Sequence, residues 1–340
     1  METYTKNTIL WLVLLLIFSL SFAYNVSKDI EVYFTTPYST SDQLKNRVLE
    51  LLDNAHSSIH MAVYALKDYD MINILKKKIK EGVDVQIAME AGNMTFSIVS
   101  LKKAGAKLYL DKDDRALTHD KFIIIDREWV VTGSTNFTPN GFEYNCNNSV
   151  IMHSKNVADD FEREFSNFEK GKFHTEKVSD NKFNFSVDGI KVEVYFSPED
   201  NIRDKIFKYL DTTNYNLYFA IYAFSDYQLA NTFLLLHSKG IKIYGIMDED
   251  WDGPGGYGYN IYESLLNKVN VELDKNKEGL WHNKFMIIDA DTNSDPMVLT
   301  GSYNFTMSAN YKNDENMIVI HSKKASDIYK NYFEKWWQRK

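Results

Sequence analysis

The chain has 340 residues, of which 44% are hydrophobic and 25% are charged, so it is long enough for about two domains with substantial cores. Its 47 Asp and Glu residues outnumber its 39 Lys and Arg residues, which gives a formal net charge of -8. This balance excludes a protein whose affinity depends on a broad basic surface, although a local basic cleft is compatible with it. The single cysteine, Cys146, excludes an internal disulfide and a cysteine-based metal site.

The chain starts with a short polar head and an apolar run from Ile9 to Ala23. A run of this length is typical of a secretory signal sequence, and Ser21-Phe22-Ala23 fits a cleavage site. Residues 1–23 are therefore predicted to be a signal peptide or an N-terminal membrane anchor. The protein is predicted to be exported, either periplasmic or secreted, and retention by an uncleaved N-terminal anchor is the alternative.

The rest of the chain repeats one order of elements. The first half is predicted to contain a strand, a helix, a strand, a helix and a strand at residues 32–34, 43–54, 58–64, 71–81 and 83–89. The second half repeats this order at residues 194–196, 201–210, 216–222, 227–238 and 241–247. Short sequences recur at matching places: E-V-Y-F occurs in both halves, and V-Y-A-L-K-D in the first is echoed by I-Y-A-F-S-D in the second. Strands that alternate with helices predict an α/β fold built from one plan used twice.

The repeat also predicts the domain organisation. The first domain is expected over residues 30–170 and the second over residues 188–340. Residues 171–187 are polar and aromatic without clear periodicity, and are predicted to be the linker.

Each half continues into a strand that is led by a histidine and a lysine. Residues 118–126 read T-H-D-K-F-I-I-I-D, and residues 281–289 read W-H-N-K-F-M-I-I-D. Alternate side chains of a strand point to the same face. His119 and Lys121 are therefore predicted to face a common space, as are His282 and Lys284.

A second motif follows each of these strands. It reads G-S-T-N at residues 133–136 and G-S-Y-N at residues 301–304. A glycine, a hydroxyl and an amide that return beside a lysine are suited to holding the oxygens of a phosphate. A single histidine at the start of a strand is more often structural than catalytic, but the same pattern in both halves favours a functional role.

The two copies resemble the signature of the phospholipase D superfamily, which is H-x-K-x(4)-D followed by G-S-x-N. Asp126 and Asp289 complete the first motif, with six residues before Gly133 in the first copy and eleven before Gly301 in the second. The resemblance implies two lobes related by pseudo-twofold symmetry, each a β-sheet flanked by helices, with both motifs meeting in one cleft. It also implies phosphodiester cleavage without a metal or another cofactor.

The resemblance further implies a two-step reaction. One histidine attacks phosphorus and becomes phosphorylated, while the other protonates the leaving oxygen and then activates water. The lysines and asparagines would neutralise the phosphoryl oxygens, the serines would bind the substrate, and the aspartates and glycines would be structural. The residues that would neutralise the phosphoryl oxygens are Lys121, Lys284, Asn136 and Asn304. The substrate-binding serines are Ser134 and Ser302, and the structural residues are Asp126, Asp289, Gly133 and Gly301.

The roles of the two histidines are predicted from the residues expected behind them. Aligning residues 143–152 with residues 311–320 sets Asn147 against Glu315, and in the family an acidic or amide residue near this spacing hydrogen-bonds the imidazole. A carboxylate behind His282 would raise its pKa, as an acid requires, and an amide behind His119 would leave it neutral, as a nucleophile requires. We therefore expect His119 to be the nucleophile and His282 the acid and base, with Glu315 catalytic and Asn147 at the substrate. The reverse assignment of the two histidines stays open.

The leading functional hypothesis is a phospholipase D that acts on phospholipid headgroups, with a phospholipid or membrane surface as its partner. The main alternative is an endonuclease of the same superfamily that cleaves DNA or RNA, because the first half resembles single-motif secreted endonucleases. A phosphatidyl transferase is a further alternative, since an alcohol can replace water in the second step. A catalytically silent binding module is disfavoured by the intact histidines and lysines.

Overall fold

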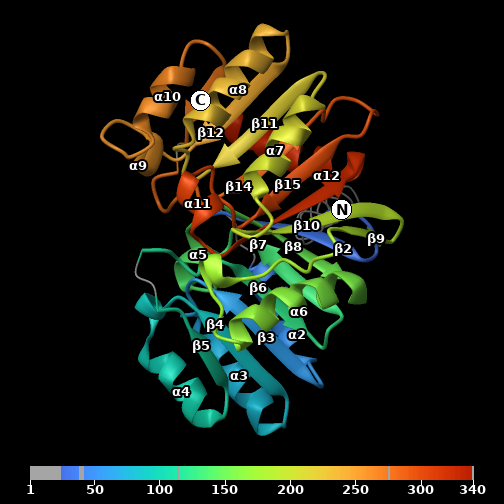
Figure 1. Ribbon diagram of the computed structural model, residues 1–340, viewed down its shortest axis with the longest axis vertical. Coiled ribbons are helices and arrows are strands. Elements are labelled where there is room, and N and C mark those ends of the chain that lie inside the picture. The colour runs from blue at the N-terminus through green and yellow to red at the C-terminus, as the bar shows by residue number, and fades with distance from the viewer. Residues whose placement is uncertain (1–23, 38–41, 113–114, 275, 339–340) are drawn as a thin grey trace, which may run out of the picture.

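The computed structural model describes residues 24–37, 42–112, 115–274 and 276–338, which form two lobes, one above the other in Figure 1. The strands of the first lobe are β1 (Tyr24–Asn25), β2 (Ile30–Thr35), β3 (Ser58–Val63), β4 (Asp84–Met89), β5 (Lys107–Leu110), β6 (Lys121–Ile125), β7 (Trp129–Gly133) and β8 (Asn147–His153). Its helices are α2 (Gln43–Asp53), α3 (Tyr69–Lys80), the 3-10 turn η1 (Ala91–Asn93), α4 (Phe96–Ala104), α5 (Pro139–Glu143) and α6 (Lys155–Glu169).

The second lobe repeats these elements after the 3-10 turn η2 (His174–Glu176). Its strands are β9 (Asn184–Val187), β10 (Ile190–Ser197), β11 (Asn216–Ile221), β12 (Lys242–Met247), β13 (Asn270–Leu273), β14 (Lys284–Ile288), β15 (Met297–Gly301) and β16 (Glu315–His321). Its helices are α7 (Ile202–Asp211), α8 (Tyr227–Ser238), α9 (Glu249–Asp252), α10 (Tyr259–Leu265), α11 (Met307–Tyr311) and α12 (Lys323–Trp337).

The two eight-stranded sheets have the same topology. Their strand orders are β1-β2-β8-β7-β6-β3-β4-β5 and β9-β10-β16-β15-β14-β11-β12-β13. The pairs β3·β4 and β11·β12 are parallel, whereas β6 and β14, which carry the lysines of the motifs, run antiparallel to β3 and β11. The prediction of an α/β fold with two lobes related by pseudo-twofold symmetry is confirmed.

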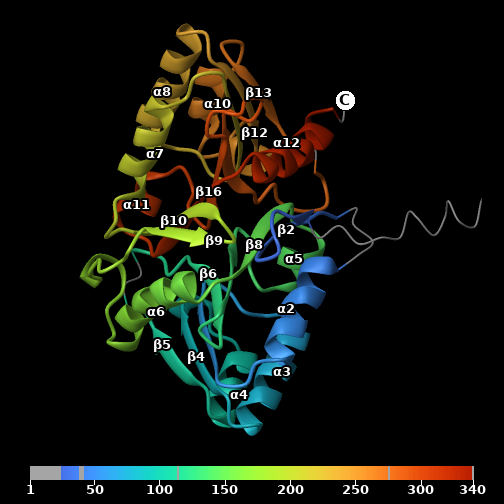
Figure 2. The same cartoon turned by 90° about the vertical axis from the view of Figure 1, so that its right-hand side faces the viewer.

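Helices cover both faces of the sheets (Figures 1 and 2). One face of each sheet packs against the outer helices, and the buried apolar residues there form a separate core in each lobe. The other faces share a central core that also contains apolar residues of α6 and α12. Rings from both lobes meet in this core: Phe122 contacts Phe196 with ring centroids 6.5 Å apart, and Phe34 stacks on Tyr332 at 3.9 Å. Burial of these rings holds the lobes together.

The predicted elements lie close to the observed ones. The helix predicted at residues 227–238 matches α8, and the one predicted at residues 71–81 begins two residues earlier, as α3. The side chains of Asp68 and Asp226 accept hydrogen bonds from the first backbone N–H groups of these two helices, which explains where the helices start. After each helix, a glycine with a positive φ angle, Gly82 or Gly240, ends it.

The proposed division into domains at residues 30–170 and 188–340 stays a prediction. The segment predicted as a linker, residues 171–187, has more structure than expected, since it contains η2 and β9. Strand β9 pairs with β10 at the edge of the second sheet. This segment is therefore partly built into the second lobe.

The prediction of an exported protein needs correction. No helix within the described residues has both the length and the apolar character needed to cross a membrane, so the structure gives no support to export or to a membrane anchor. Residues 1–23, on which that prediction was based, lie outside the described residues.

The contact between β11 and β12 generates a prediction about stability. Gly245 in β12 lies opposite Phe219 in β11, and a Cβ atom at Gly245 would lie 2.1 Å from the Phe219 ring. Because Phe219 is fully buried, we expect Gly245→Ala to reduce the free energy of unfolding by about 1–3 kcal/mol, as measured by urea denaturation. Phe219→Leu in the Gly245→Ala background should restore part of this loss. A second substitution that only adds to the loss would contradict this steric explanation.

Candidate active site

The segments before the motif strands cross to the other lobe. Leu117 is paired with the residues that precede β16: the backbone N–H of Asp314 donates to the Leu117 carbonyl at 2.9 Å, and the Asn313 side chain accepts from the Leu117 N–H at 3.1 Å. Leu280 is paired in the same way with Cys146 and Asn145, at 2.9 and 3.1 Å. Each histidine therefore reaches the last strand of the opposite lobe.

The two histidines have different partners there. His119 Nδ1 lies 2.8 and 2.9 Å from the carboxylate oxygens of Glu315, and His282 Nδ1 lies 2.9 Å from Asn147 Oδ1. The predicted pairing is therefore wrong: the carboxylate stands behind His119 and the amide behind His282. The alignment of Asn147 with Glu315 was correct, but each of these residues faces the histidine of the opposite lobe. Asn147, which was expected at the substrate, instead orients His282.

The motif lysines lie beside their histidines. Lys121 Nζ donates to the His119 carbonyl at 2.6 Å, and Lys284 Nζ donates to the His282 carbonyl at 3.1 Å. Both lysines are almost completely buried, with 1% and 2% of their surface exposed. The structure thus gathers both His-Lys pairs where the lobes meet.

Two tyrosines that were not predicted as site residues complete this arrangement. The ring of Tyr64 lies 5.2 Å from the His119 ring and 5.4 Å from Lys121 Nζ. The ring of Tyr222 lies 4.9 Å from the His282 ring and 5.1 Å from Lys284 Nζ. An aromatic face attracts a cation, so each ring helps to fix its lysine. The sequence carried a signal for them, because both tyrosines stand in the repeated V-Y-A and I-Y-A segments.

The G-S-x-N residues divide into two groups. The Ser134 hydroxyl donates to Asn147 Oδ1 at 3.0 Å, and the Ser302 hydroxyl is hydrogen-bonded to the Glu315 carboxylate and accepts from the Asn316 N–H at 3.0 Å. Both serines are fully buried, so the geometry favours orientation of Asn147 and Glu315 over the expected contact with substrate.

The asparagines of this motif have side-chain oxygens that are not used in hydrogen bonds with the described residues. The side-chain oxygens of Asn136 and Asn304 are buried and have no hydrogen-bond partner among the described residues. Buried polar groups without partners are uncommon and occur at functional sites. These two amides therefore remain candidates for contact with a ligand.

The motif aspartates and glycines lie away from the imidazoles. Asp126 accepts hydrogen bonds from the backbone N–H groups of residues 56–58, at the start of β3, and Asp289 accepts from those of residues 214–216, at the start of β11. Gly133 and Gly301 allow close strand contact, since a Cβ atom there would lie 2.3 and 2.2 Å from carbonyl oxygens of the neighbouring strand. These contacts agree with the structural roles implied by the resemblance.

The electrostatics of the site suit an anion. Burial lowers the pKa of both His119 and His282 well below the usual value, and the neighbouring lysines lower it further. Burial also lowers the pKa of Lys121 to about 8 and that of Lys284 well below its usual range. The pKa of Glu315 is raised to about 8 by burial, although Lys121 opposes this effect. An anion between the two lysines would stabilise their charged forms.

Two further residues brace the strands across the lobes. Asn148 accepts from the backbone N–H of Lys284 at 3.1 Å, and Asn316 donates to Asp120 Oδ1 at 2.7 Å. Both follow the aligned pair Asn147 and Glu315 directly, so the repeated asparagine was a signal for them.

Metal binding has no evident site in the described part of the chain, where no group of three or more His, Cys, Asp or Glu residues is arranged to hold an ion. Reaction without a metal or another cofactor stays a prediction. A pocket of about 520 Å³ lies at the linker segment, and its lining includes none of the motif residues. The candidate active site is therefore the place where the motifs converge, and not this pocket.

Comparison with known proteins supports the sequence resemblance. Residues 48–168 and 206–337 match the family model described as cardiolipin synthase, PLD-like domain. Phospholipase D of Rickettsia conorii is 28% identical over 150 residues, which are 44% of this chain and 70% of that protein. Mitochondrial cardiolipin hydrolase of Xenopus tropicalis is 32% identical over 123 residues, 36% of this chain and 55% of that protein.

Among solved structures, phosphatidylserine synthase of Haemophilus influenzae superposes with a TM-score of 0.69 over 91% of this chain and 86% of that chain. Polyphosphate kinase of Porphyromonas gingivalis superposes with a TM-score of 0.65 over 94% of this chain and 52% of that one. These two proteins are only 13% and 12% identical to this chain in sequence, so the similarity shows the fold alone.

The crossed pairing predicts how the two histidines titrate. Glu315→Gln removes the group whose ionised form stabilises the His119 imidazolium, so the pKa of His119 should fall further below its usual value. Asn147→Asp adds a carboxylate at His282 and should raise its pKa. NMR titration of labelled imidazoles measures both effects, with His321, at the far end of β16, as the internal control. An effect of Glu315→Gln on His282 alone would contradict the pairing.

Proposed function

The chain belongs to the phospholipase D superfamily, and we propose that it is a metal-independent phosphodiesterase that cleaves phospholipid headgroups through a phosphohistidine. The family match and the names of the relatives support a phosphodiesterase-type enzyme. The observation that carries the proposal is the convergence of two His-Lys pairs, in which each imidazole is oriented by a residue of the other lobe.

We assign the first step to His119. Its Nδ1–H donates to Glu315, which directs Nε2 with its lone pair toward phosphorus. Attack forms the N–P bond and breaks the bond to the leaving oxygen, and the phosphorylated ring becomes positively charged. Burial raises the pKa of Glu315 to about 8, but the positive ring favours its ionised form, and the carboxylate then stabilises that charge in the way that a carboxylate supports the imidazolium of a catalytic triad.

His282 then acts as acid and base. The Asn147 oxygen accepts its Nδ1–H and fixes the ring without adding negative charge, so its imidazolium is the stronger acid and gives its proton to the leaving oxygen. In the second step the neutral ring takes a proton from water, whose oxygen attacks phosphorus and releases His119. The roles proposed for the two histidines are those expected from the sequence, but the reason for them has changed. The carboxylate now stands behind the nucleophile, whose positive charge it stabilises, and the amide stands behind the acid, whose proton it leaves easier to release.

The lysines and asparagines bind the phosphoryl group in this proposal. The ammonium groups of Lys121 and Lys284 and the amides of Asn136 and Asn304 neutralise charge that builds on the oxygens during attack. This explains why buried lysines with lowered pKa values are kept in the site, since the anion restores their charged forms.

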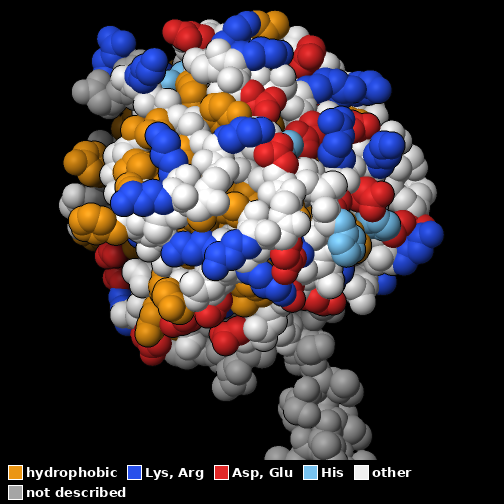
Figure 3. Space-filling model, turned by 90° about the horizontal axis from the view of Figure 1, so that it is seen from below, with side chains coloured by type: hydrophobic (Ala, Val, Ile, Leu, Met, Phe, Trp, Pro, Cys, Tyr) orange, Lys and Arg blue, Asp and Glu red, His pale blue; other side chains and the backbone are white. Residues whose placement is uncertain are grey.

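A phospholipid is favoured over a nucleic acid as substrate. Relatives of the chain are named phospholipase D and cardiolipin hydrolase. The formal net charge of -8 offers little general attraction for a polyanion. On the face seen in Figure 3, basic and acidic side chains are intermixed.

The substrate prediction is tested by parallel assays in excess chelator. We expect the purified protein to hydrolyse bis(p-nitrophenyl) phosphate and to release headgroups from mixed phospholipid vesicles. Plasmid DNA and RNA should be cleaved far more slowly.

Faster cleavage of nucleic acid than of phospholipid would establish the nuclease alternative, and transfer of the phosphatidyl group to an added alcohol would establish the transferase. Activity that disappears in chelator and returns with a divalent ion would contradict metal independence.

The roles of the histidines are tested by trapping the intermediate. In His282→Ala, the first step should survive with bis(p-nitrophenyl) phosphate, because p-nitrophenolate leaves without a proton. A phosphohistidine should then accumulate at His119, because no base activates water. In His119→Ala, no phosphorylated enzyme should form. Peptide mapping of acid-labile phosphate is the measurement: label at His282 would reverse the roles, and no label in either variant would remove the covalent mechanism.

A further inference from the structure

A buried ion network lies directly behind the His119 side of the site, and its cations come from the segment predicted as a linker. Asp314, which precedes Glu315, is fully buried. One of its carboxylate oxygens accepts the backbone N–H of His174 at 2.7 Å and lies 3.1 Å from Lys177 Nζ. The other lies 3.0 Å from His174 Nδ1. Two cationic side chains from the linker segment thus hold this one carboxylate.

Asp314 also fixes the backbone of the catalytic motif. Its carbonyl accepts the His119 N–H at 3.0 Å, and its own N–H donates to the Leu117 carbonyl at 2.9 Å. Its carboxylate accepts from the Thr118 hydroxyl at 3.2 Å. The residue that the linker cations hold therefore sets the register in which Glu315 meets His119.

Lys177 is the most buried cation of this network. Its side chain has no exposed surface, and it contacts Glu164, Glu199 at 3.2 Å and the Ser197 carbonyl at 2.9 Å in addition to Asp314. A buried ion network of this kind often costs as much in desolvation as it returns in attraction. A role in function, and not in stability alone, would explain why it is kept.

Among the described residues, no equivalent network is recorded at the pseudo-symmetric position in the other half of the site. Cys146 precedes Asn147 and donates its N–H to Leu280 just as Asp314 donates to Leu117. Cys146 therefore occupies the place of Asp314, with a thiol where the other lobe has a carboxylate. In the described part of the chain, the network therefore stands behind the histidine assigned as the nucleophile.

We propose that His174 and Lys177, here called the linker clamp, are positioning residues for His119 that act through Asp314. The clamp neutralises and immobilises the Asp314 carboxylate and so keeps Glu315 at His119 Nδ1 while the ring attacks phosphorus. This inference rests on the proposed function, in which His119 is the nucleophile.

The charges of the clamp agree with this role. Burial opposes the protonation of His174, but its contacts with Asp111 and Asp314 raise its pKa to about 9, so it is cationic at neutral pH. Burial would raise the pKa of Asp314, but Lys177 and His174 hold it below the usual value. Without His174, Asp314 would be a less compensated buried carboxylate.

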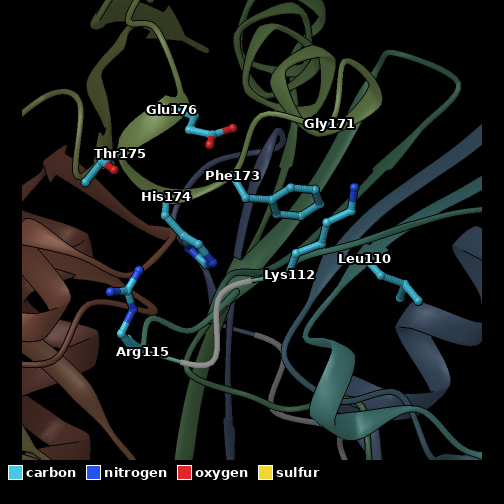
Figure 4. A pocket seen from close by; sticks show the side chains of 8 residues that line it. All are labelled: Leu110, Lys112, Arg115, Gly171, Phe173, His174, Thr175 and Glu176. Atoms are coloured by element: carbon cyan, nitrogen blue, oxygen red, sulfur yellow. The ribbon is translucent and has the colours of Figure 1, made fainter.

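His174 is the better residue to change. It forms part of the wall of the pocket of about 520 Å³, together with Lys112 and Arg115 from the loop after β5 (Figure 4). Its substitution leaves the contacts of Lys177 with Glu164 and Glu199 in place, whereas loss of Lys177 would expose several buried carboxylates to mutual repulsion and prevent folding.

The test compares two matched histidine variants. We expect His174→Gln to slow formation of the phosphorylated enzyme from bis(p-nitrophenyl) phosphate by about tenfold or more while KM changes little, because a small displacement of the nucleophile acts on the chemical step. The control is His321→Gln: His321 also bridges two carboxylates, Glu193 and Asp295, and its side chain is 8% exposed against 7% for His174. This control should react at a rate close to that of the wild type.

A second substitution separates positioning from a purely structural role. In the His174→Gln background, Asp314 keeps only the Lys177 cation of the clamp, and Asp314→Asn removes this less compensated buried charge, so the double variant should react faster than His174→Gln alone. A rate for His174→Gln equal to that of the control, or a double variant no faster than the single one, would overturn the linker clamp while leaving the proposed function intact. A wild-type protein that forms no phosphorylated enzyme would overturn both.

Discussion

The structure depends on the hydrogen bond that each motif histidine makes across the boundary between the lobes. His119 is held by Glu315 and His282 by Asn147, and in both cases the partner comes from the other half of the chain. The same crossing carries the backbone pairing of Leu117 with Asp314 and of Leu280 with Cys146. Contacts that fix the lobes relative to each other therefore also set the tautomer and orientation of each imidazole, and the central aromatic core holds that arrangement rigid.

Local patterns predicted the parts of each lobe well. Short apolar segments predicted β3 and β11, helical patterns predicted α3 and α8, and the repeat predicted the topology that the two lobes share. The candidate site residues could also be identified from the sequence, because histidine, lysine and asparagine recur in the same register in both halves. These features depend on residues that are close together in the chain, and a periodic sequence pattern predicts local structure of this kind.

The pairing across the lobes was not within reach of the same reasoning. Alignment correctly matched Asn147 with Glu315, but a repeat only shows that two positions are equivalent. It does not show whether each one faces its own lobe or the other, because that depends on how two sheets far apart in the chain pack together. The serines illustrate the same point: Ser134 was expected to bind the substrate, yet its buried hydroxyl donates to Asn147 and accepts from the Asn148 N–H. Likewise, the absence of periodicity in residues 171–187 concealed the contacts of Lys177 with both lobes.

The crossed arrangement also gives a physical reason for both lobes to lie on one chain. Two identical lobes in a symmetric dimer would give both histidines the same partner, because every contact across the axis is made twice. One chain with two lobes removes that constraint, and here the equivalent positions differ: Glu315 opposes Asn147, and Asp314 opposes Cys146. A carboxylate supports the positive charge of a phosphorylated imidazole, and a neutral amide leaves the other imidazolium a stronger acid. In the proposed mechanism, divergence of two residues at the start of each last strand is therefore enough to turn a symmetric pair of histidines into a nucleophile and an acid.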